Sequence, residues 1–569
     1  MTEANNLAVQ SLRRFLHIGG DSLNYNPWFF CNEPSIQQIN QEKLADAIEQ
    51  CATSGGEKAL TEEFKKIFEN GSSPHPICVI VALAKSMKAS DIKVRQEAYK
   101  LVHQVCRTSK ELFMLMHCSE TLNQPCTGWG RGFRRAICEW YTSHEPLALA
   151  CEVTKHPGGN WTHKDILKLI HMKPKTTEQK LLFCYVMRGL PEAEKQLTEG
   201  EPEELKDLLS YLHDVDAVKH CVSTVGEEGH SKSAEGEEVR SLLEKSNLSL
   251  DHVPTRFHKS PEIWEVLIPR MLILEALNCV KRLSLAGLLK KSHPLLVSKL
   301  QQKLSDPDGL KDSPVHPAKV FLVLKEYENP SLVQKLLHDR AQRRHAPSGM
   351  IRRPPKAPPK PNKKVVEALN NLLKNSFQAL PRTGKKWLVV LETTPEMVST
   401  KCHVRPIVTV IEAAAVIALS LLKAEATGDV KILIREDKAG GSANVTAFDA
   451  EPTSTMKAFL AKLTDRCKGG LVGFTQSIQW SIHNNFPADA IIFITRRSNE
   501  FVRVSEVEPL RSCLSQFKSH FKSELKVVTC GFSISKTSVA AESPGVLTLS
   551  GFNETIPPII HAFVSGAFS

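Results

Sequence analysis

The chain has 569 residues, which is too long for one ordinary domain, and its composition of 41% hydrophobic and 24% charged residues is globular. Its 15 cysteines include no Cys-x-x-Cys pair, which argues against a zinc finger or a disulfide framework and indicates a reducing compartment. The formal net charge of +11 is compatible with a polyanionic partner without requiring one.

The N-terminus is polar and has no apolar signal core. The most apolar run, residues 413–422, is too short to span a bilayer and is interpreted as a core helix. We therefore expect no membrane association and a cytoplasmic location, with the nucleus as an open second location.

The first 345 residues show the periodicity of amphipathic helices. In the stretch "GFRRAICEWY", the apolar residues recur at i, i+3, i+4, i+7 and i+8 and form one stripe: Phe133, Ala136, Ile137, Trp140 and Tyr141. Comparable stripes occur at 58–68, 75–86, 91–106, 162–172, 261–279, 282–303 and 315–326. Many short helices joined by short turns predict an α-solenoid of stacked helix pairs.

Two segments interrupt this pattern. Residues 223–238 are small, polar and acidic, which predicts a mobile loop. Residues 341–364 are rich in proline and basic residues and contain no acid, which predicts an extended linker. A solvated hinge and a basic tether for RNA phosphates or a nuclear-import receptor both fit this linker.

Residues 365–569 alternate between helices and apolar strands, including "KWLVVLE", "DVKILIR", "ADAIIFIT" and "ELKVVTCGF". This alternation predicts an α/β domain with a mostly parallel sheet, whose ligands bind at the carboxyl ends of the strands. The first strand is followed by Glu392, Thr394 and Glu396, whose side-chain oxygens are of the kind that hold a hard cation such as magnesium.

Basic residues gather in 128–176. Arg131, Arg134 and Arg135 share a helix face away from the apolar stripe. In the next helix, Thr162 is the predicted N-cap, with Asp165 three residues later. Its basic face is predicted to carry Lys164, Lys168 and His171, and its apolar face Ile166, Leu169 and Ile170. A phosphate-binding groove and two ordinary solvated helix faces both remain open.

The roles of the aromatic and histidine residues of this segment are not determined by their spacing. Trp129 and Trp161 could stack on unpaired bases or pack against the core. His163 and His171 are too far apart to share a metal without other ligands and are interpreted as surface histidines. The sequence contains no motif of a hydrolase, nucleotide-binding loop or zinc protease, so we expect neither an enzyme nor a cofactor.

The motifs "LRRFLHIGG", "WGRGFRRAI", "THKDILKLIHMKP", "HPAKVFLVL" and "TGKKWLVVLE" resemble the Ro ribonucleoprotein family over nearly the whole chain. The resemblance implies a ring of HEAT-like helical repeats, the TROVE module, followed by a von Willebrand factor A-like domain (the A-like domain). Family members bind Y RNA on the outside of the ring, and single-stranded 3′ ends of misfolded RNAs enter its basic hole.

By this resemblance, Lys164 and Lys168 match basic positions of the family at the hole. Further residues match the same RNA-binding segment or lie beside it: His171, Lys173, Arg131, Arg134 and Arg135. Arg13 and Arg14 match a basic N-terminal segment. The expected partners are small noncoding RNA and misfolded RNA 3′ ends, with a protein partner for the A-like domain, and the chain is expected to be a monomer.

The A-like domain departs from the metal motif of its family, Asp-x-Ser-x-Ser followed by a threonine and an aspartate in later loops. Glu392, Thr394 and Glu396 occupy the first motif, Leu471 the threonine position and Arg496 the aspartate position. We therefore expect no metal and hypothesise that Arg496 pairs with Glu392 or Glu396. The predicted function is Y RNA binding and RNA quality control, and the alternative is a protein-interaction scaffold without an RNA role.

Overall fold

The computed structural model describes residues 3–31, 41–55, 57–69, 75–122, 128–155, 160–196, 202–221, 232–345, 358–437, 443–497, 507–534 and 545–568. The chain forms two compact units. The first contains Met1–Asp21 and Ser35–Arg270, and the second contains Ser22–Pro34 and Met271–Ser569. Within the described ranges, no helix combines the length and the apolar character needed to cross a membrane.

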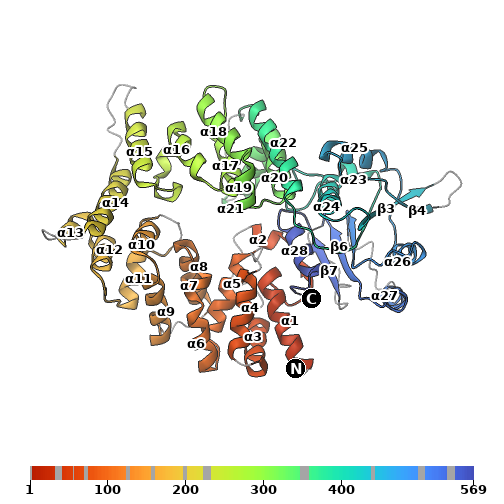
Figure 1. The fold of residues 1–569 in the computed structure, drawn as a ribbon, viewed down its shortest axis with the longest axis horizontal. Helices are drawn as coiled ribbons and strands as arrows, with labels where there is room; N and C mark the ends of the chain where they lie inside the picture. The colour runs from red at the N-terminus through yellow and green to blue at the C-terminus, as the bar shows by residue number, and fades with distance from the viewer. Residues whose placement is uncertain are drawn as a thin grey trace. The chain divides into compact units, whose positions relative to one another are not determined.

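The first unit is helical throughout its described residues (Figure 1). Its α-helices are α1 (Glu3–Ile18), α3 (Gln41–Gly55), α4 (Glu57–Glu69), α5 (Pro76–Ser86), α6 (Ile92–Lys100), α7 (Val102–Val105), α8 (Ser109–Thr121), α9 (Arg131–Thr142), α10 (Pro146–Thr154), α11 (His163–Ile170), α12 (Thr177–Arg188), α13 (Leu190–Glu194), α14 (Glu203–His220), α15 (Lys232–Ser246) and α16 (Pro261–Arg270). Two short 3-10 helices, η2 (Leu250–His252) and η3 (Thr255–Lys259), precede α16. Helices close in sequence pack together, among them α3 with α4, α9 with α11 and α15 with α16.

Side-chain caps determine where several of these helices begin. Thr108 and Glu111 form a capping box at the start of α8. The Thr162 side chain accepts a hydrogen bond from the Asp165 backbone N–H at the start of α11. Such caps satisfy backbone N–H groups that have no partner inside the helix. The predicted N-cap at Thr162 is therefore confirmed.

The second unit combines helices with one sheet. Its helices are α2 (Trp28–Cys31), α17 (Ile273–Leu285), α18 (Pro294–Leu304), α19 (Pro307–Asp312), α20 (Pro317–Glu328), α21 (Pro330–His345), α22 (Lys363–Gln378), α23 (Glu396–Ser399), α24 (Val410–Ala424), α25 (Met456–Asp465), α26 (Phe474–His483), α27 (Val507–Phe521) and α28 (Ile556–Val564). Its strands are β1 (Asn24–Tyr25), β2 (Trp387–Leu391), β3 (Val430–Asp437), β4 (Ala443–Ala447), β5 (Ala490–Thr495), β6 (Lys526–Gly531) and β7 (Val546–Ser550).

The strands lie in the order β1-β7-β6-β5-β2-β3-β4. Neighbouring strands are parallel except β3 and β4. α26 and α27 cover one face through a buried cluster that includes Val390, Ile478, Phe493 and Phe517. α24 contacts β2 and β3 and lies with α28 on the other side of the strands (Figure 1). The predicted fold class, helical repeats followed by a doubly wound parallel sheet, is confirmed, while closure of the repeats into a ring stays a prediction.

The helices α17–α22 belong to the unit of the sheet because packing and ion pairs join them to it. α20 and α22 both contact α24. Lys325 of α20 pairs with Glu412 of α24 at 2.6 Å. Arg405, in the loop before α24, donates from Nη2 to both carboxylate oxygens of Glu554 at 2.9 Å, and Lys319 of α20 lies 3.2 Å from the same carboxylate. The compact units therefore divide at Arg270, before the predicted boundary between 1–345 and 365–569.

Several expected element boundaries are wrong in detail. The predicted stripe 282–303 is divided, because α17 ends at Leu285 and α18 begins at Pro294. The predicted helix 261–279 is interrupted after Arg270, next to Pro269, which lacks a backbone N–H for a helical hydrogen bond. The predicted linker 341–364 is helical at both ends, because α21 extends to His345 and α22 begins at Lys363, and residues 346–357 lie outside the described residues. α15 begins at Lys232, so helix replaces the end of the predicted loop 223–238, whose first part also lies outside the described residues.

The ion pairs around Glu554 predict an acid-sensitive contribution to stability. Burial alone would raise the pKa of Glu554, but the charges of Arg405 and Lys319 outweigh it and lower the pKa to about 2. The stabilisation is therefore complete above the unfolded pKa near 4.5 and is lost as the pH falls toward 2. Glu554→Gln should lower the free energy of unfolding of this unit by about 2 kcal/mol at pH 7, measured by urea denaturation.

The difference between Glu554→Gln and the wild type should shrink as the pH falls from 5 to 3. Glu524→Gln is the matched control, because its partner Lys518 and its own carboxylate are both exposed. A constant difference across this pH range would contradict the assignment of the low pKa to Glu554.

Candidate nucleic-acid interface

The helix α9 separates its apolar and basic residues as predicted. Phe133, Ala136, Ile137, Trp140 and Tyr141 are buried. On the other side, Arg131 and Arg135 are exposed and Arg134 is half-buried. The predicted stripe on α9 is thus confirmed, and its burial points the arginines toward solvent.

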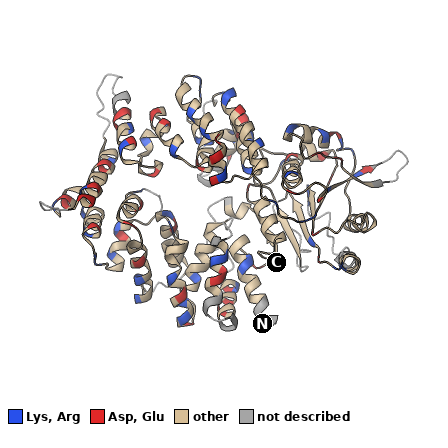
Figure 2. Ribbon diagram, viewed as in Figure 1, with Lys and Arg blue, Asp and Glu red and all other residues tan. Residues whose placement is uncertain are grey.

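The helix α11 presents a basic face beside α9, with which it is in contact. Lys164, Lys168 and the flanking residues His171 and Lys173 are all exposed. His171 ends the helix in the left-handed conformation, with a φ of 51°. Figure 2 shows that basic residues recur along α9 and α11, whereas acidic residues gather on α13 and α14.

The apolar face of α11 differs from the prediction at one position. Ile166 and Ile170 are buried as predicted, but Leu169 is 44% exposed and Leu167 is buried instead. Leu169 therefore adds an exposed apolar side chain next to Lys168 on the basic face.

His163, the first residue of α11, is buried, so its interpretation as a surface histidine is wrong. Its Nδ1 lies 2.7 Å from the Tyr141 hydroxyl of α9, and its Nε2 lies 3.0 Å from the Ser109 hydroxyl of α8. Burial lowers the pKa of His163 to about 4, so the ring is neutral at pH 7. One histidine thus joins the beginnings of α8 and α11 to α9.

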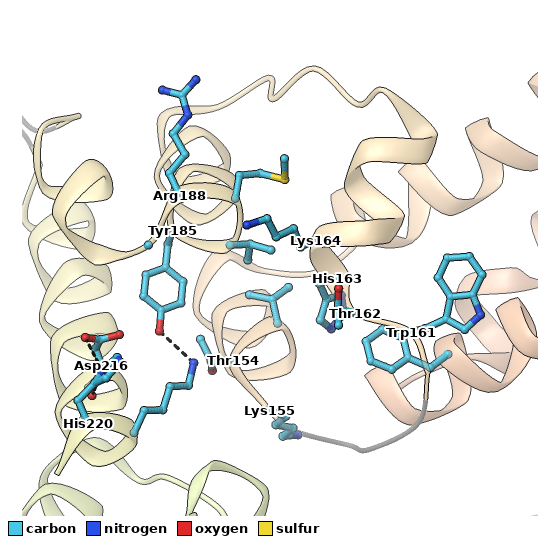
Figure 3. Close-up of a pocket in the computed structure, with 16 residues that line it drawn as sticks. Thr154, Lys155, Trp161, Thr162, His163, Lys164, Tyr185, Arg188, Asp216 and His220 are labelled. Carbon is cyan, nitrogen blue, oxygen red and sulfur yellow. Dashed lines mark hydrogen bonds and ion pairs between the residues drawn. The ribbon is translucent and has the colours of Figure 1, made fainter. Parts of the chain in front are cut away.

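A cavity of about 650 Å³ opens beside the basic face of α11. Its walls come from the ends of α10, α12 and α14 and from the start of α11 (Figure 3). Lys164 lines it together with Trp161, Tyr185, Arg188 and Lys219. Lys164 extends from α11 toward α12 across this space (Figure 3).

The tryptophans and the N-terminal arginines have partners within the protein. Trp129 and Trp161 contact each other, with ring centroids 5.7 Å apart, and both are half-buried. Arg13 donates two hydrogen bonds to Glu63 of α4, at 2.6 and 2.8 Å. Arg14 donates to the Asp21 carbonyl oxygen. Arg13 therefore fixes α1 to α4, and its role in RNA binding stays a prediction.

At the carboxyl end of β2, Glu392 is buried and bonded through both of its oxygens. Arg496, directly after β5, donates its backbone N–H to Oε2 at 2.8 Å and its Nε–H to Oε1 at 2.7 Å. The Thr394 hydroxyl donates to the same Oε1. Glu396 is farther away, 3.9 Å from Arg496 Nη2. The predicted pairing of Arg496 with Glu392 is thus present in the structure.

This loop does not fit a divalent cation. Both oxygens of Glu392 already accept hydrogen bonds, and Arg496 brings a positive charge to the place where an ion would bind. Leu471 packs against the buried apolar cluster and offers no oxygen. No group of three or more His, Cys, Asp or Glu side chains in the described part of the chain could hold a metal.

Residues 386–564 match the model of the Ro60 vWA domain family. The RNA-binding protein RO60 of Caenorhabditis elegans is 23% identical over 610 residues, which cover 98% of this chain and 87% of that protein. The RNA-binding protein RO60 of Deinococcus radiodurans is 21% identical over 495 residues, which cover 86% of this chain and 81% of that protein. The resemblance to the Ro family is confirmed.

A solved structure shows the same fold. The crystal structure of the Ro (RSR) protein of Deinococcus radiodurans matches with a TM-score of 0.74 and 17% sequence identity, covering 98% of this chain and 100% of that one. The likeness shows that this chain has the Ro fold.

Sequence reasoning missed the cavity beside α11. Arg188 and Lys219 lie on α12 and α14, and neither belongs to the basic segment 128–176 from which the prediction was made. The spacing of Lys164 and Lys168 indicated the exposed face but carried no information on which distant helices surround it.

The buried position of His163 predicts a pH dependence. Its folded pKa near 4 is lower than the ordinary value of 6.5, so between these values the unfolded chain binds a proton that the folded chain does not. Stability should therefore fall as the pH decreases from 6.5 to 5, by about 2 kcal/mol from this residue. In urea denaturation, His163→Gln should lose about 2 kcal/mol less stability than the wild type between pH 6.5 and 5. His171→Gln, at the exposed end of α11, should lose as much stability as the wild type over the same pH range.

The Arg496–Glu392 pair predicts a large stability effect in the A-like domain. Arg496→Ala leaves the buried Glu392 carboxylate without its cationic partner, which should lower the free energy of unfolding by about 3 kcal/mol. Arg497→Ala, at the exposed neighbouring position, should have little effect. Wild-type thermal stability should not change with millimolar MgCl₂, and a clear increase would contradict the poor fit of this loop to a cation.

Proposed function

We propose that this chain is a non-enzymatic RNA-binding protein, the protein core of a small noncoding ribonucleoprotein. The observation that carries the proposal is the exposed basic face formed by α11 and the adjacent α9. Lys164 and Lys168 lie on α11, and Arg131 and Arg135 lie on α9. Within the described part of the chain, none of these four side chains forms an ion pair with an acidic residue, so their charges are open to an external anion.

The chemistry of this face suits RNA phosphates. Exposed lysine and arginine side chains attract the RNA backbone, and arginine can bind one phosphate through two hydrogen bonds. The names of the two relatives, both called RNA-binding protein RO60, support the same ligand class. The finer proposal is that the ligands are Y RNA and the 3′ ends of misfolded noncoding RNAs, bound for RNA quality control.

An electrophoretic mobility shift with a Y RNA tests the proposal. Lys164→Ala/Lys168→Ala should weaken binding at least tenfold at moderate salt, because two phosphate contacts of about 1 kcal/mol or more each are removed. The affinity of the wild type should fall steeply with salt, and the logarithmic salt slope of the variant should be smaller by about 2.

Lys299→Ala/Lys303→Ala is the matched control, because these lysines have the same i, i+4 spacing on α18 of the second unit. This control should bind as the wild type does. No binding by the wild type would favour the alternative of a protein-interaction scaffold. Equal binding by the wild type and Lys164→Ala/Lys168→Ala would move the interface away from α11.

A further inference from the structure

We propose that the outer edge of β4 binds an extended peptide segment of a partner protein, which adds one strand to the sheet and places an apolar side chain in a groove beside Trp480. This inference concerns the A-like domain and does not depend on the proposed RNA-binding function. Two observations carry it, the edge position of β4 and the groove next to that strand.

The strand β4 ends the sheet. It is the last strand in the order and pairs only with β3 among the described residues (Figure 1). Directly after the strand, the Phe448 backbone N–H donates to the Ile432 carbonyl oxygen at 2.7 Å. In an antiparallel ladder, successive residues alternate between bonding to the neighbouring strand and pointing away from it. The backbone groups of Thr446 therefore point toward β3, whereas those of Val445 and Ala447 point outward.

These outward backbone groups are suited to another strand. Within the described part of the chain, the backbone N–H and C=O groups of Val445 and Ala447 have no hydrogen-bond partner on that side. Val445 is half-buried and Ala447 is exposed, so the edge is accessible. Unpaired N–H and C=O groups at a sheet edge are a template for an added strand, and peptide recognition often uses this pairing.

A groove of about 580 Å³ begins at the same strand. Val445 lines it from β4, Trp480 and Ile482 line it from α26, and Gln516 lines it from α27. The first three are half-buried and pack against the apolar cluster beneath α26 and α27, so they form an apolar floor. Because side chains alternate along a strand, every second side chain of a peptide paired with β4 would face this groove.

The rim of the groove suits an uncharged peptide. It consists of side-chain amides and one histidine: Gln476, Gln479, His483, Asn484 and Gln516. The amides of Gln479 and Gln516 and the indole N–H of Trp480 form no hydrogen bond within the described residues. Amides both donate and accept hydrogen bonds, as the peptide group does. No Lys, Arg, Asp or Glu is among the described residues that line the groove, so it provides no countercharge for RNA phosphates.

A second copy of this chain is the alternative strand donor, because it has the same edge. Pairing between two β4 strands would make the protein a dimer, whereas a peptide of a partner protein would leave it a monomer. The oligomeric state of the full chain therefore separates the two occupants.

The experiment obtains a defined probe by selecting random short peptides, displayed on phage, against the full chain. One enriched peptide is synthesised with a fluorescein label, and its dissociation constant is measured by fluorescence anisotropy. Two further copies carry a methyl group on every second backbone nitrogen, in the two alternate registers. One of these copies should bind about tenfold more weakly than the unmodified peptide, because it cannot donate hydrogen bonds to β4.

Two variants locate the binding site. Val445→Pro removes an outward N–H and keeps the hydrogen bonds to β3, so it should weaken binding about tenfold. Gln516→Arg places a longer, charged side chain at the rim and should weaken binding about fivefold. Ser512→Arg is the matched control, because Ser512 lies one turn earlier on α27, is exposed and does not line the groove. This control should bind the peptide as the wild type does.

The methylated peptides and Gln516→Arg keep the test valid if Val445→Pro does not fold. Failure to enrich any peptide, or equal binding by the methylated peptides and by the folded variants, would overturn the proposal. A wild-type dimer that Val445→Pro converts to a monomer, measured by size-exclusion chromatography with light scattering, would overturn it in favour of a second copy. Val445→Pro and Gln516→Arg should bind Y RNA as the wild type does, because β4 and α27 belong to a different unit from α9 and α11.

Discussion

The arrangement of the proposed interface depends on one buried histidine. His163 cannot be both buried and charged at low cost, so it is held neutral between the hydroxyls of Tyr141 and Ser109. Because His163 is the first residue of α11, these two bonds fix the rotation of a helix of only eight residues. That rotation buries Ile166 and Ile170 and leaves Lys164 and Lys168 at the surface.

The same constraint connects the basic face with the cavity. Once α11 is fixed, Lys164 stands at the border between the exposed face and the recess enclosed by α10, α12 and α14. Acidic residues gather on the neighbouring helices α13 and α14 (Figure 2).

In the A-like domain an internal charge takes the place that the Ro family's metal motif assigns to an ion. Glu392 follows β2 and Arg496 follows β5, and these two strands are neighbours in the sheet. From β2 the strand order continues to β3 on one side, and from β5 it continues to β6 on the other side. Ligands of doubly wound sheets bind at this position. In this chain the guanidinium and the Thr394 hydroxyl satisfy Glu392, so the loop is stabilised without an external ligand.

Sequence patterns predicted the features that depend on local spacing or on a known motif. The buried stripe of α9 and the cap at Thr162 follow from residues one or two turns apart, and the Arg496–Glu392 pair follows from the family motif across 104 residues. The burial of His163 could not be predicted, because its partner Ser109 is 54 residues away and carries no signal. The sequence pattern placed Leu169 on the apolar face of α11, whereas Leu167 is the buried residue, because a helix of eight residues has too few turns to define its apolar face. The edge strand β1 was missed because it has two residues and gains its partner β7 from the far end of the chain.

Photocrosslinking with an RNA that carries 4-thiouridine tests most directly whether α9 and α11 form the RNA interface. The account predicts that mass spectrometry will find crosslinked peptides from residues 128–142 and 160–176. Crosslinks confined to residues 271–569, with RNA fully bound, would contradict it.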